Sequence, residues 1–275
     1  MKIALMDSGN GLLAASAAVR RLRPDADIVL SSDPDGMPWG PRTPDDVTAH
    51  ALDVARAAAA HEPEALIVAC NTASVHALPA LRAELEPAIP VIGTVPAIKP
   101  AAAGGGPVAI WATPATTGSP YQRDLIGRFA QGVDVAQVPC PGLAEGVQEA
   151  DGAAIDAAVA AAARRTPREV RAVVLGCTHY ELVAERIRAA LQQPGAPALV
   201  LHGSAEAVAA QALRRIGVDP APAAAPTGGL HVILSGRPSA LPAVALAYPE
   251  GRLLAESGGP AESGASLVAD AAVRR

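Results

Sequence analysis

The chain has 275 residues, of which half are apolar and only 2% aromatic, and it carries a formal net charge of −5. This length provides for one large or two medium α/β domains whose cores are built from aliphatic side chains. The acidic balance argues against nucleic-acid binding, and no apolar stretch is long and uninterrupted enough to span a bilayer.

Strand-length apolar runs alternate with helical patterns along most of the chain, which is typical of βαβ units with mostly parallel sheets. The first part predicts strands at 3–6, 26–30, 66–69 and 90–93, and helices ending near 21 and covering 45–60 and 74–86. The glycine-rich segment 101–107 then interrupts the pattern and is the best candidate for a crossing between domains.

The alternation resumes after this break. The pattern predicts strands at 108–111, 133–138, 173–175, 198–201 and 230–234, and helices at about 121–130, 153–165 and 181–191. Residues 220–226 are rich in proline and alanine and predict an extended linker. The end beyond Gly258 is expected to be loosely ordered.

The start of the chain reaches an acidic residue too early for a secretory signal, so a soluble cytoplasmic protein is expected. Its three cysteines lack the C-x-x-C spacing of a zinc site and are too few for a disulfide framework. The six histidines show no ligand spacing such as H-x-x-x-H, so no metal is expected. Histidines on surface helices, such as His50 and His61, are expected to be solvated.

Two of the cysteines, Cys70 and Cys177, each follow a predicted buried strand at the point where the chain becomes polar. In open α/β sheets this is where ligands bind, so we expect one site with a sulfur on each side. One thiolate could attack an electrophile, or two thiols could exchange protons with opposite faces of a substrate carbon. Both chemistries remain open at this point.

Simpler interpretations exist for several of these residues. Cys140, which precedes a proline, is expected to be a structural buried side chain. Asp7 could serve only as the N-cap of the first helix, and Thr113 or Thr116 could cap the helix near residue 121.

Several short motifs stand in the order and spacing of the glutamate racemase family. They are Asp7-Ser8-Gly9, Pro38-Trp39-Gly40, Ala69-Cys70-Asn71-Thr72-Ala73-Ser74, the segments 90–97 and 112–116, and Leu175-Gly176-Cys177-Thr178-His179-Tyr180. The chain therefore resembles this family, within the aspartate/glutamate racemase superfamily, from Lys2 to about Ala210.

The resemblance implies racemisation of L- and D-glutamate without a cofactor, which supplies D-glutamate for peptidoglycan. It implies that Cys70 and Cys177 serve opposite faces of the substrate, one as thiolate base and the other as thiol acid. Asp7 and His179 would assist the first and the second cysteine. The only lysines, Lys2 and Lys99, are poorly placed for a Schiff base, which also argues against pyridoxal phosphate.

The resemblance also implies which residues bind the substrate. They are Asp7, Ser8, Pro38, Trp39, Gly40, Asn71, Thr72, Thr113, Thr116, Thr178 and His179. Of these, Asn71, Thr72 and Thr178 would donate hydrogen bonds to the substrate carboxylates. The expected partner is a small amino acid, with no nucleic acid and no membrane, and a homodimer is compatible with the sequence.

The fold expected from these patterns is a pair of similar α/β domains, each a mostly parallel sheet flanked by helices, with the active site in the cleft between them. The first domain would comprise residues 1–97 plus 207–275, and the second residues 98–206.

Three positions depart from the family pattern. Gln148 stands where the family has a glutamate, with Glu145 and Glu149 nearby; Gly203 replaces an aspartate, and Trp39 replaces a tyrosine. A neutral glutamine cannot titrate or act as a charged partner. Two other functions therefore stay open: a racemase, isomerase or decarboxylase of the same superfamily acting on aspartate or another small acid, and a silent amino-acid-binding protein.

Overall fold

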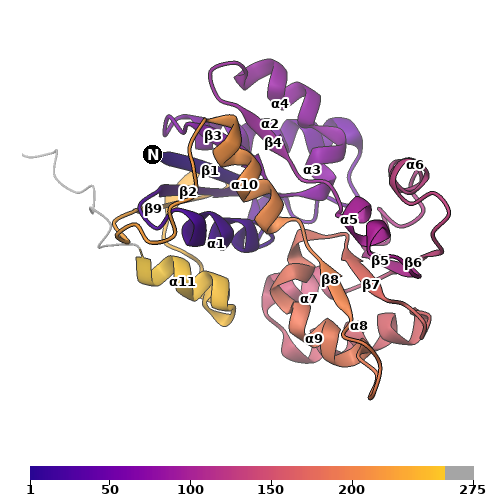
Figure 1. Ribbon diagram of the computed structural model, residues 1–275. Helices are drawn as coiled ribbons and strands as arrows, with labels where there is room; N and C mark the ends of the chain where they lie inside the picture. The colour runs from indigo at the N-terminus through magenta and orange to yellow at the C-terminus, as the bar shows by residue number, and fades with distance from the viewer. Residues whose placement is uncertain (258–275) are drawn as a thin grey trace, which may run out of the picture.

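The computed structural model describes residues 1–257, which form two mostly parallel β-sheets with helices on both faces (Figure 1). The larger sheet has the strand order β10-β9-β2-β1-β3-β4, and the smaller has the order β6-β5-β7-β8. Among the described strands, the pair β9 and β10 is antiparallel and all other neighbours are parallel. The predicted fold class is confirmed.

The bounds of the elements are as follows. The strands are β1 (Lys2–Asp7), β2 (Asp27–Ser32), β3 (Ala65–Val68), β4 (Val91–Gly93), β5 (Val108–Ala112), β6 (Val135–Pro139), β7 (Ala172–Leu175), β8 (Val200–His202), β9 (Leu230–Leu234) and β10 (Arg237–Ser239). The α-helices are α1 (Leu12–Leu22), α2 (Pro44–Ala59), α3 (Asn71–His76), α4 (Leu78–Leu85), α5 (Ile98–Ala103), α6 (Pro120–Phe129), α7 (Leu143–Glu149), α8 (Gly152–Arg165), α9 (Ala184–Leu191), α10 (Ala205–Arg215) and α11 (Pro249–Ser257). The 3₁₀ helices are η1 (Pro34–Gly36), η2 (Thr178–Val183) and η3 (Ala243–Ala247).

Each face of the larger sheet packs against its own helices, because successive side chains of a strand point to opposite faces. In β1, Ile3 and Leu5 belong to the core that includes α1 and α10, whereas Ala4 and Met6 belong to the core under α2 and α4. A strand that is buried on both faces consists of consecutive apolar residues. These strands could therefore be predicted from the sequence.

The smaller sheet follows the same rule. Ile110 of β5 packs in the core that includes α5 and α6, while its neighbour Trp111 packs with α8 and α9. The core around Trp111 continues through η2 to α1, so one hydrophobic cluster joins the two sheets. This shared core holds the carboxyl ends of the two sets of strands near each other.

The C-terminal return to the larger sheet depends on a buried arginine. Arg20 is only 2% exposed, and its guanidinium donates to the carbonyls of Ala26 at 2.7 Å and Gly229 at 2.9 Å. These bonds fix the start of β9 beside β2, with which it pairs in parallel. The carbonyls satisfy donors on both Nη atoms and so offset the cost of burying the charge, although Nε has no partner within residues 1–257.

Two predicted helices differ from those observed. The helix expected at 74–86 is two helices, α3 and α4, because Pro79 in the first turn of α4 has no N–H to continue α3. The helix expected at 181–191 begins instead as the 3₁₀ helix η2 and becomes α-helical only at Ala184. Because α3 begins at Asn71 and η2 at Thr178, a helical turn directly follows each of the two cysteines.

Several elements were not predicted: α5, α7, α10, α11 and β10. Residues 101–103 of the expected glycine-rich break belong to α5, and the chain passes from β4 to β5 over residues 94–107. The proposed linker at 220–226 contains no helix or strand. The expectation for the end beyond Gly258 lies outside the described residues.

Candidate active site

A cavity of about 190 Å³ lies where strands of both sheets end. It is lined by every residue that the sequence suggested: Asp7, Ser8, Pro38, Trp39, Gly40, Cys70, Asn71, Thr72, Thr113, Thr116, Cys177, Thr178 and His179. It is also lined by residues that sequence reasoning did not assign to the site: Met37, Pro41, Pro114, Ala115, Ala144, Glu145 and Gly176. Pro114, Ala115 and Gly176 lie within the motifs, and Met37 and Pro41 flank one of them, whereas Ala144 and Glu145 come from the unpredicted helix α7.

The two cysteines occupy matching backbone positions. Cys70 has φ −140° and ψ 121° before α3, and Cys177 has φ −138° and ψ 135° before η2. Burial raises the pKa of the Cys70 thiol well above its usual value, and the nearby Asp7 raises it further. Burial also raises the pKa of Cys177 to about 12. Both side chains are therefore neutral thiols at pH 7, and each needs a neighbouring base to become a thiolate.

Asp7, at the end of β1, is fully buried. Neither of its carboxylate oxygens has a hydrogen bond of ordinary geometry to any part of the chain that the structure describes. Burial raises the pKa of this carboxyl, while the nearby His179, the Cys70 side chain and the backbone N–H groups of Ser8 and Gly9 lower it by less. The N-cap interpretation is wrong, because α1 begins at Leu12 and its cap residue is Gly11.

His179 lies beside both Asp7 and the second cysteine. Its ring is 4% exposed, and Nδ1 is 3.9 Å from Cys177 Sγ and 4.0 Å from Asp7 Oδ2. Its other nitrogen, Nε2, is 3.1 Å from Gln148 Oε1. Burial lowers the pKa of His179, whereas the carboxylates of Asp7 and Glu145 raise it by less. The imidazole is therefore neutral at pH 7.

Asn71 connects the loops that follow β3 and β7. Its Nδ2 donates to the carbonyl of Gly176 at 2.8 Å, which fixes the orientation of the amide. Its oxygen Oδ1 is buried and has no partner within residues 1–257. The free polar atom that Asn71 offers to a ligand is thus an acceptor, whereas the family resemblance implied a donor.

The wall formed by residues 37–40 is held by a buried aspartate. Asp33 accepts hydrogen bonds from Trp39 Nε1 at 3.2 Å and from the backbone N–H of Gly36 at 3.1 Å. His50 Nδ1 lies 2.7 Å from the same carboxylate. The expectation that His50 is solvated is wrong: its side chain is 29% exposed, and its ring faces Asp33 from α2.

We expect Asp33→Asn to loosen this wall. The substitution removes the charge that His50 and Trp39 contact, so the free energy of unfolding should fall by about 1–3 kcal/mol. Because Trp39 lines the cavity, KM for the substrate should rise more than kcat falls. Chemical denaturation and steady-state kinetics measure the two effects. The exposed Asp45→Asn is the control, and equal behaviour of the two variants would contradict the assignment.

The side chain of Glu181 explains why glycine, and not the aspartate of the family pattern, stands at position 203. The Glu181 carboxylate accepts from the N–H of Ser204 at 2.8 Å and that of Ala205 at 3.2 Å, and so caps α10. A Cβ at residue 203 would lie 2.3 Å from Glu181 Oε2. An aspartate at position 203 would displace that carboxylate. The cap that Glu181 provides therefore requires a residue without a side chain at position 203.

The two threonines do not cap the following helix. The N-cap of α6 is Ser119, whose hydroxyl accepts from the N–H of Gln122 at 3.1 Å. The hydroxyls of Thr113 and Thr116 lie 3.1 Å apart, and both residues line the cavity.

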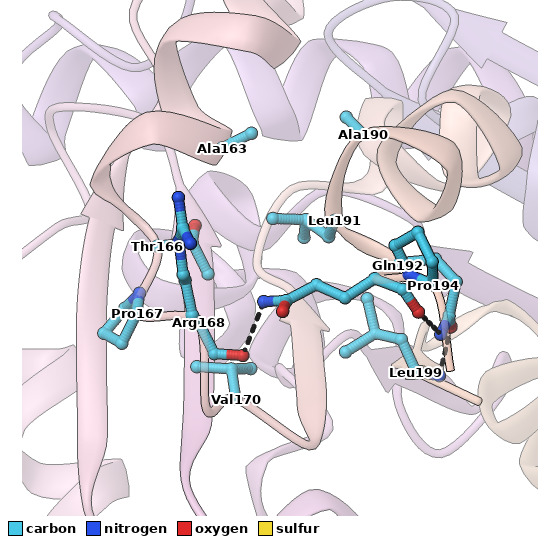
Figure 2. Close-up of a pocket in the computed structure, with 11 residues that line it drawn as sticks. Ala163, Thr166, Pro167, Arg168, Val170, Ala190, Leu191, Gln192, Pro194 and Leu199 are labelled. Atoms are coloured by element: carbon cyan, nitrogen blue, oxygen red, sulfur yellow. Dashed lines mark hydrogen bonds between the residues drawn. The ribbon is translucent and has the colours of Figure 1, made fainter. Parts of the chain in front are cut away.

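A larger cavity, of about 390 Å³, lies elsewhere, between the ends of α8 and α9 (Figure 2). Two hydrogen bonds join residues of its wall: the Gln193 side chain donates to the Arg168 carbonyl at 3.0 Å, and the Leu199 N–H donates to the Gln192 side chain at 2.8 Å. Neither cysteine nor histidine lines it. Cys70, Cys177 and His179 line the smaller cavity instead.

Within residues 1–257, no three histidine, cysteine, aspartate or glutamate side chains gather closely enough to hold a metal ion. No helix in the same range combines the length and apolar character needed to cross a membrane.

Comparison with known proteins is consistent with the fold and the cavity. A family model for Asp/Glu/hydantoin racemases matches residues 12–215, and the chain belongs to this family. Within it, the chain is 40% identical over 195 residues to the glutamate racemase of Roseiflexus sp. strain RS-1, which spans 68% of this chain and 70% of the relative. It is 33% identical over 251 residues to that of Pseudomonas putida strain F1, which spans 87% and 90%. The predicted resemblance is confirmed.

Solved structures show the same relationship. The chain is similar to Escherichia coli glutamate racemase in complex with L-glutamate and the activator UDP-MurNAc-Ala, with a TM-score of 0.75 and 26% identity over 94% of this chain and 95% of the other. It is also similar to Thermus thermophilus glutamate racemase in complex with β-chloro-D-alanine, with a TM-score of 0.65 and 30% identity over 94% of each chain.

Proposed function

We propose that this protein interconverts L- and D-glutamate without a cofactor, in the cytoplasm, and so supplies D-glutamate for peptidoglycan. The observation that carries the proposal is the position of Cys70 and Cys177, which line one cavity from the ends of β3 and β7. A pair of proton-transfer groups on two sides of a substrate carbon is what racemisation requires. The names of the relatives point to glutamate as the substrate.

Each thiol has its own base in this scheme. Asp7 serves Cys70, and His179 serves Cys177. When one thiol has passed its proton to its base, the resulting thiolate removes the Cα proton from one face of the amino acid. The other cysteine, still a thiol, returns a proton to the opposite face, and the roles reverse for the other enantiomer.

The charge that develops next to the substrate carboxylate needs hydrogen-bond donors. Thr72 and Thr178 line the cavity, and their hydroxyls are suited to this role, as are backbone N–H groups beside them. Asn71 Oδ1, an acceptor without a partner in the described chain, is suited to the substrate ammonium group.

The size and lining of the cavity favour a small substrate and a reaction without pyridoxal phosphate. Its volume of about 190 Å³ is below the roughly 300–1,000 Å³ typical of sites for drug-sized ligands. No lysine lines it, and the Lys2 ammonium donates to the His61 carbonyl at 2.7 Å.

We also propose the division into domains at residues 1–97 plus 207–275 and residues 98–206, of which residues 258–275 lie outside the part of the chain that the structure describes. The helix α5 contacts β5, β7 and β8 of the smaller sheet, and α10 contacts β3 and β4 of the larger one. The chain therefore changes sheets near the two proposed boundaries.

Incubation with L-glutamate in deuterated water tests the proposed function directly. We expect D-glutamate to form with deuterium at Cα, because the returned proton comes from a thiol that exchanges with solvent. Formation of no D-glutamate and no deuterated substrate would refute it. A parallel panel with aspartate and other small acids identifies a different substrate, and thermal stabilisation by glutamate without turnover identifies a binding protein.

A further inference from the structure

The side chain of Gln148, on α7, crosses from the smaller to the larger sheet. Its side-chain oxygen Oε1 accepts a hydrogen bond from the backbone N–H of Asn10 at 2.7 Å. The backbone carbonyl of Gln148 accepts a second hydrogen bond from the Asn10 side-chain amide at 3.0 Å. A backbone N–H can only donate, so the oxygen end of the Gln148 amide must face Asn10. This contact settles the orientation of the amide.

The same oxygen, Gln148 Oε1, also contacts the His179 ring. Oε1 lies 3.1 Å from His179 Nε2, and an amide oxygen can only accept, so Nε2 must carry the hydrogen. In a neutral imidazole the other nitrogen then holds a lone pair. That nitrogen, Nδ1, is the one that lies 3.9 Å from Cys177 Sγ.

The loop after β1 packs closely against both groups. A Cβ at Gly9 would lie 2.3 Å from Gln148 Oε1, and a Cβ at Gly11 would lie 2.7 Å from His179 Nδ1. The two glycines of this loop therefore allow the backbone to pack directly against the Gln148 amide and the imidazole. The contacts hold both groups in place before any substrate arrives.

We propose that Gln148 is a positioning residue that holds His179 in the Nε2–H tautomer, so that Nδ1 can take the proton of the Cys177 thiol. In this step the S–H bond breaks and an N–H bond forms at Nδ1, which leaves a thiolate beside an imidazolium. The role of this step in racemisation rests on the proposed function, whereas the tautomer itself does not.

Glutamine and glutamate differ at this position in charge, not in acceptor geometry. Either could accept from Asn10 and from His179 Nε2, but a carboxylate would favour the imidazolium. The charged and titratable groups that already face His179 are Asp7 from β1, Glu145 from α7 and Cys177. With neutral Gln148, His179 stays in its basic form to a lower pH than it would beside a further carboxylate.

Two variants distinguish the effect of Gln148 on the tautomer of His179 from the effect of a charge at position 148. Gln148→Leu removes the acceptor, and Gln148→Glu keeps it and adds a charge. The control is Glu149→Gln, which changes charge at the exposed neighbouring position. Long-range ¹H–¹⁵N NMR of the imidazole rings reports the tautomer, and the His179 signals are assigned by their loss in His179→Asn.

We expect the Nε2–H tautomer for His179 in the unaltered protein and in Glu149→Gln, and a mixture of tautomers in Gln148→Leu. An Nδ1–H tautomer in the unaltered protein, or spectra unchanged in Gln148→Leu, would overturn the proposal. Because NMR needs no turnover, this result stands apart from the success or failure of the racemase assignment.

The pH profile of kcat/KM provides the second readout. Gln148→Glu should move the acid limb to higher pH by about 1 unit, because a nearby carboxylate raises the pKa of His179. Gln148→Leu should lower kcat by about 10- to 100-fold in the direction in which Cys177 is the base, with KM less affected. An acid limb that stays in place in Gln148→Glu would count against the proposal.

Discussion

Replacing either cavity cysteine with alanine should stop interconversion of the enantiomers. We expect Cys70→Ala and Cys177→Ala each to lower the racemisation rate by at least about 10³-fold, because each removes a proton-transfer group from one face of the substrate. The measurement is the formation of D-glutamate from L-glutamate, and of L-glutamate from D-glutamate, by chiral chromatography.

The two variants should also differ from each other in a defined way. Each keeps one cysteine and its base, so each should exchange the Cα proton of only one enantiomer with deuterated water. The enantiomer exchanged by Cys70→Ala should be the one that Cys177→Ala does not exchange. If both variants exchange the same enantiomer, the two cysteines do not serve opposite faces.

Cys140 provides the matched control. It is buried, its thiol donates to the Val138 carbonyl at 3.5 Å, and it does not line the cavity. Cys140→Ala should retain racemisation in both directions. A loss comparable to that of the other two variants would show that cysteine removal acts through folding.

The second large effect is expected at Asp7, where activity and stability should change in opposite directions. Asp7→Asn removes the base beside Cys70, so turnover should fall by about 10²-fold in the direction that needs the Cys70 thiolate. It also removes a buried charge whose oxygens make no hydrogen bond of ordinary geometry in the described chain, so the free energy of unfolding at pH 7 should rise by about 1–3 kcal/mol.

The pH dependence of this gain follows from the direction of the pKa shift. Burial raises the pKa of Asp7 in the folded protein above its value in the unfolded chain, so folding favours the protonated carboxyl. The cost of the buried charge is absent below the unfolded pKa of about 3.9 and grows as pH rises through the folded pKa. The gain in Asp7→Asn should therefore be present at pH 7 and vanish near pH 4.

Denaturation of both proteins across this pH range measures the effect. Asp33→Asn is the contrasting variant, because Asp33 is also buried but has hydrogen-bond partners. It should destabilise at pH 7, where Asp7→Asn stabilises. An Asp7→Asn protein that is less stable than its parent at pH 7 would mean that the carboxylate contributes favourable contacts to the fold.

The sequence by itself determined the strands other than β10, the fold class and the candidate reactive residues. Strands such as β1 and β7 are buried on both faces, so they read as uninterrupted apolar runs that contrast with their surroundings. Cys70 and Cys177 stand at the carboxyl ends of such runs, and parallel strands bring those ends to one edge of a sheet. Local pattern and short motifs were sufficient for these features.

Only the tertiary structure decided which groups support the reactive ones. Gln148 lies 31 residues from His179 and 138 from Asn10, yet it bonds to both, and its helix α7 has too few residues for a clear helical pattern. The contact between Asp33 and His50 likewise depends on tertiary structure, because the packing of α2 against β2 brings the two side chains together. Hydrogen-bond partners and burial depend on how distant segments pack, which local residue patterns do not encode.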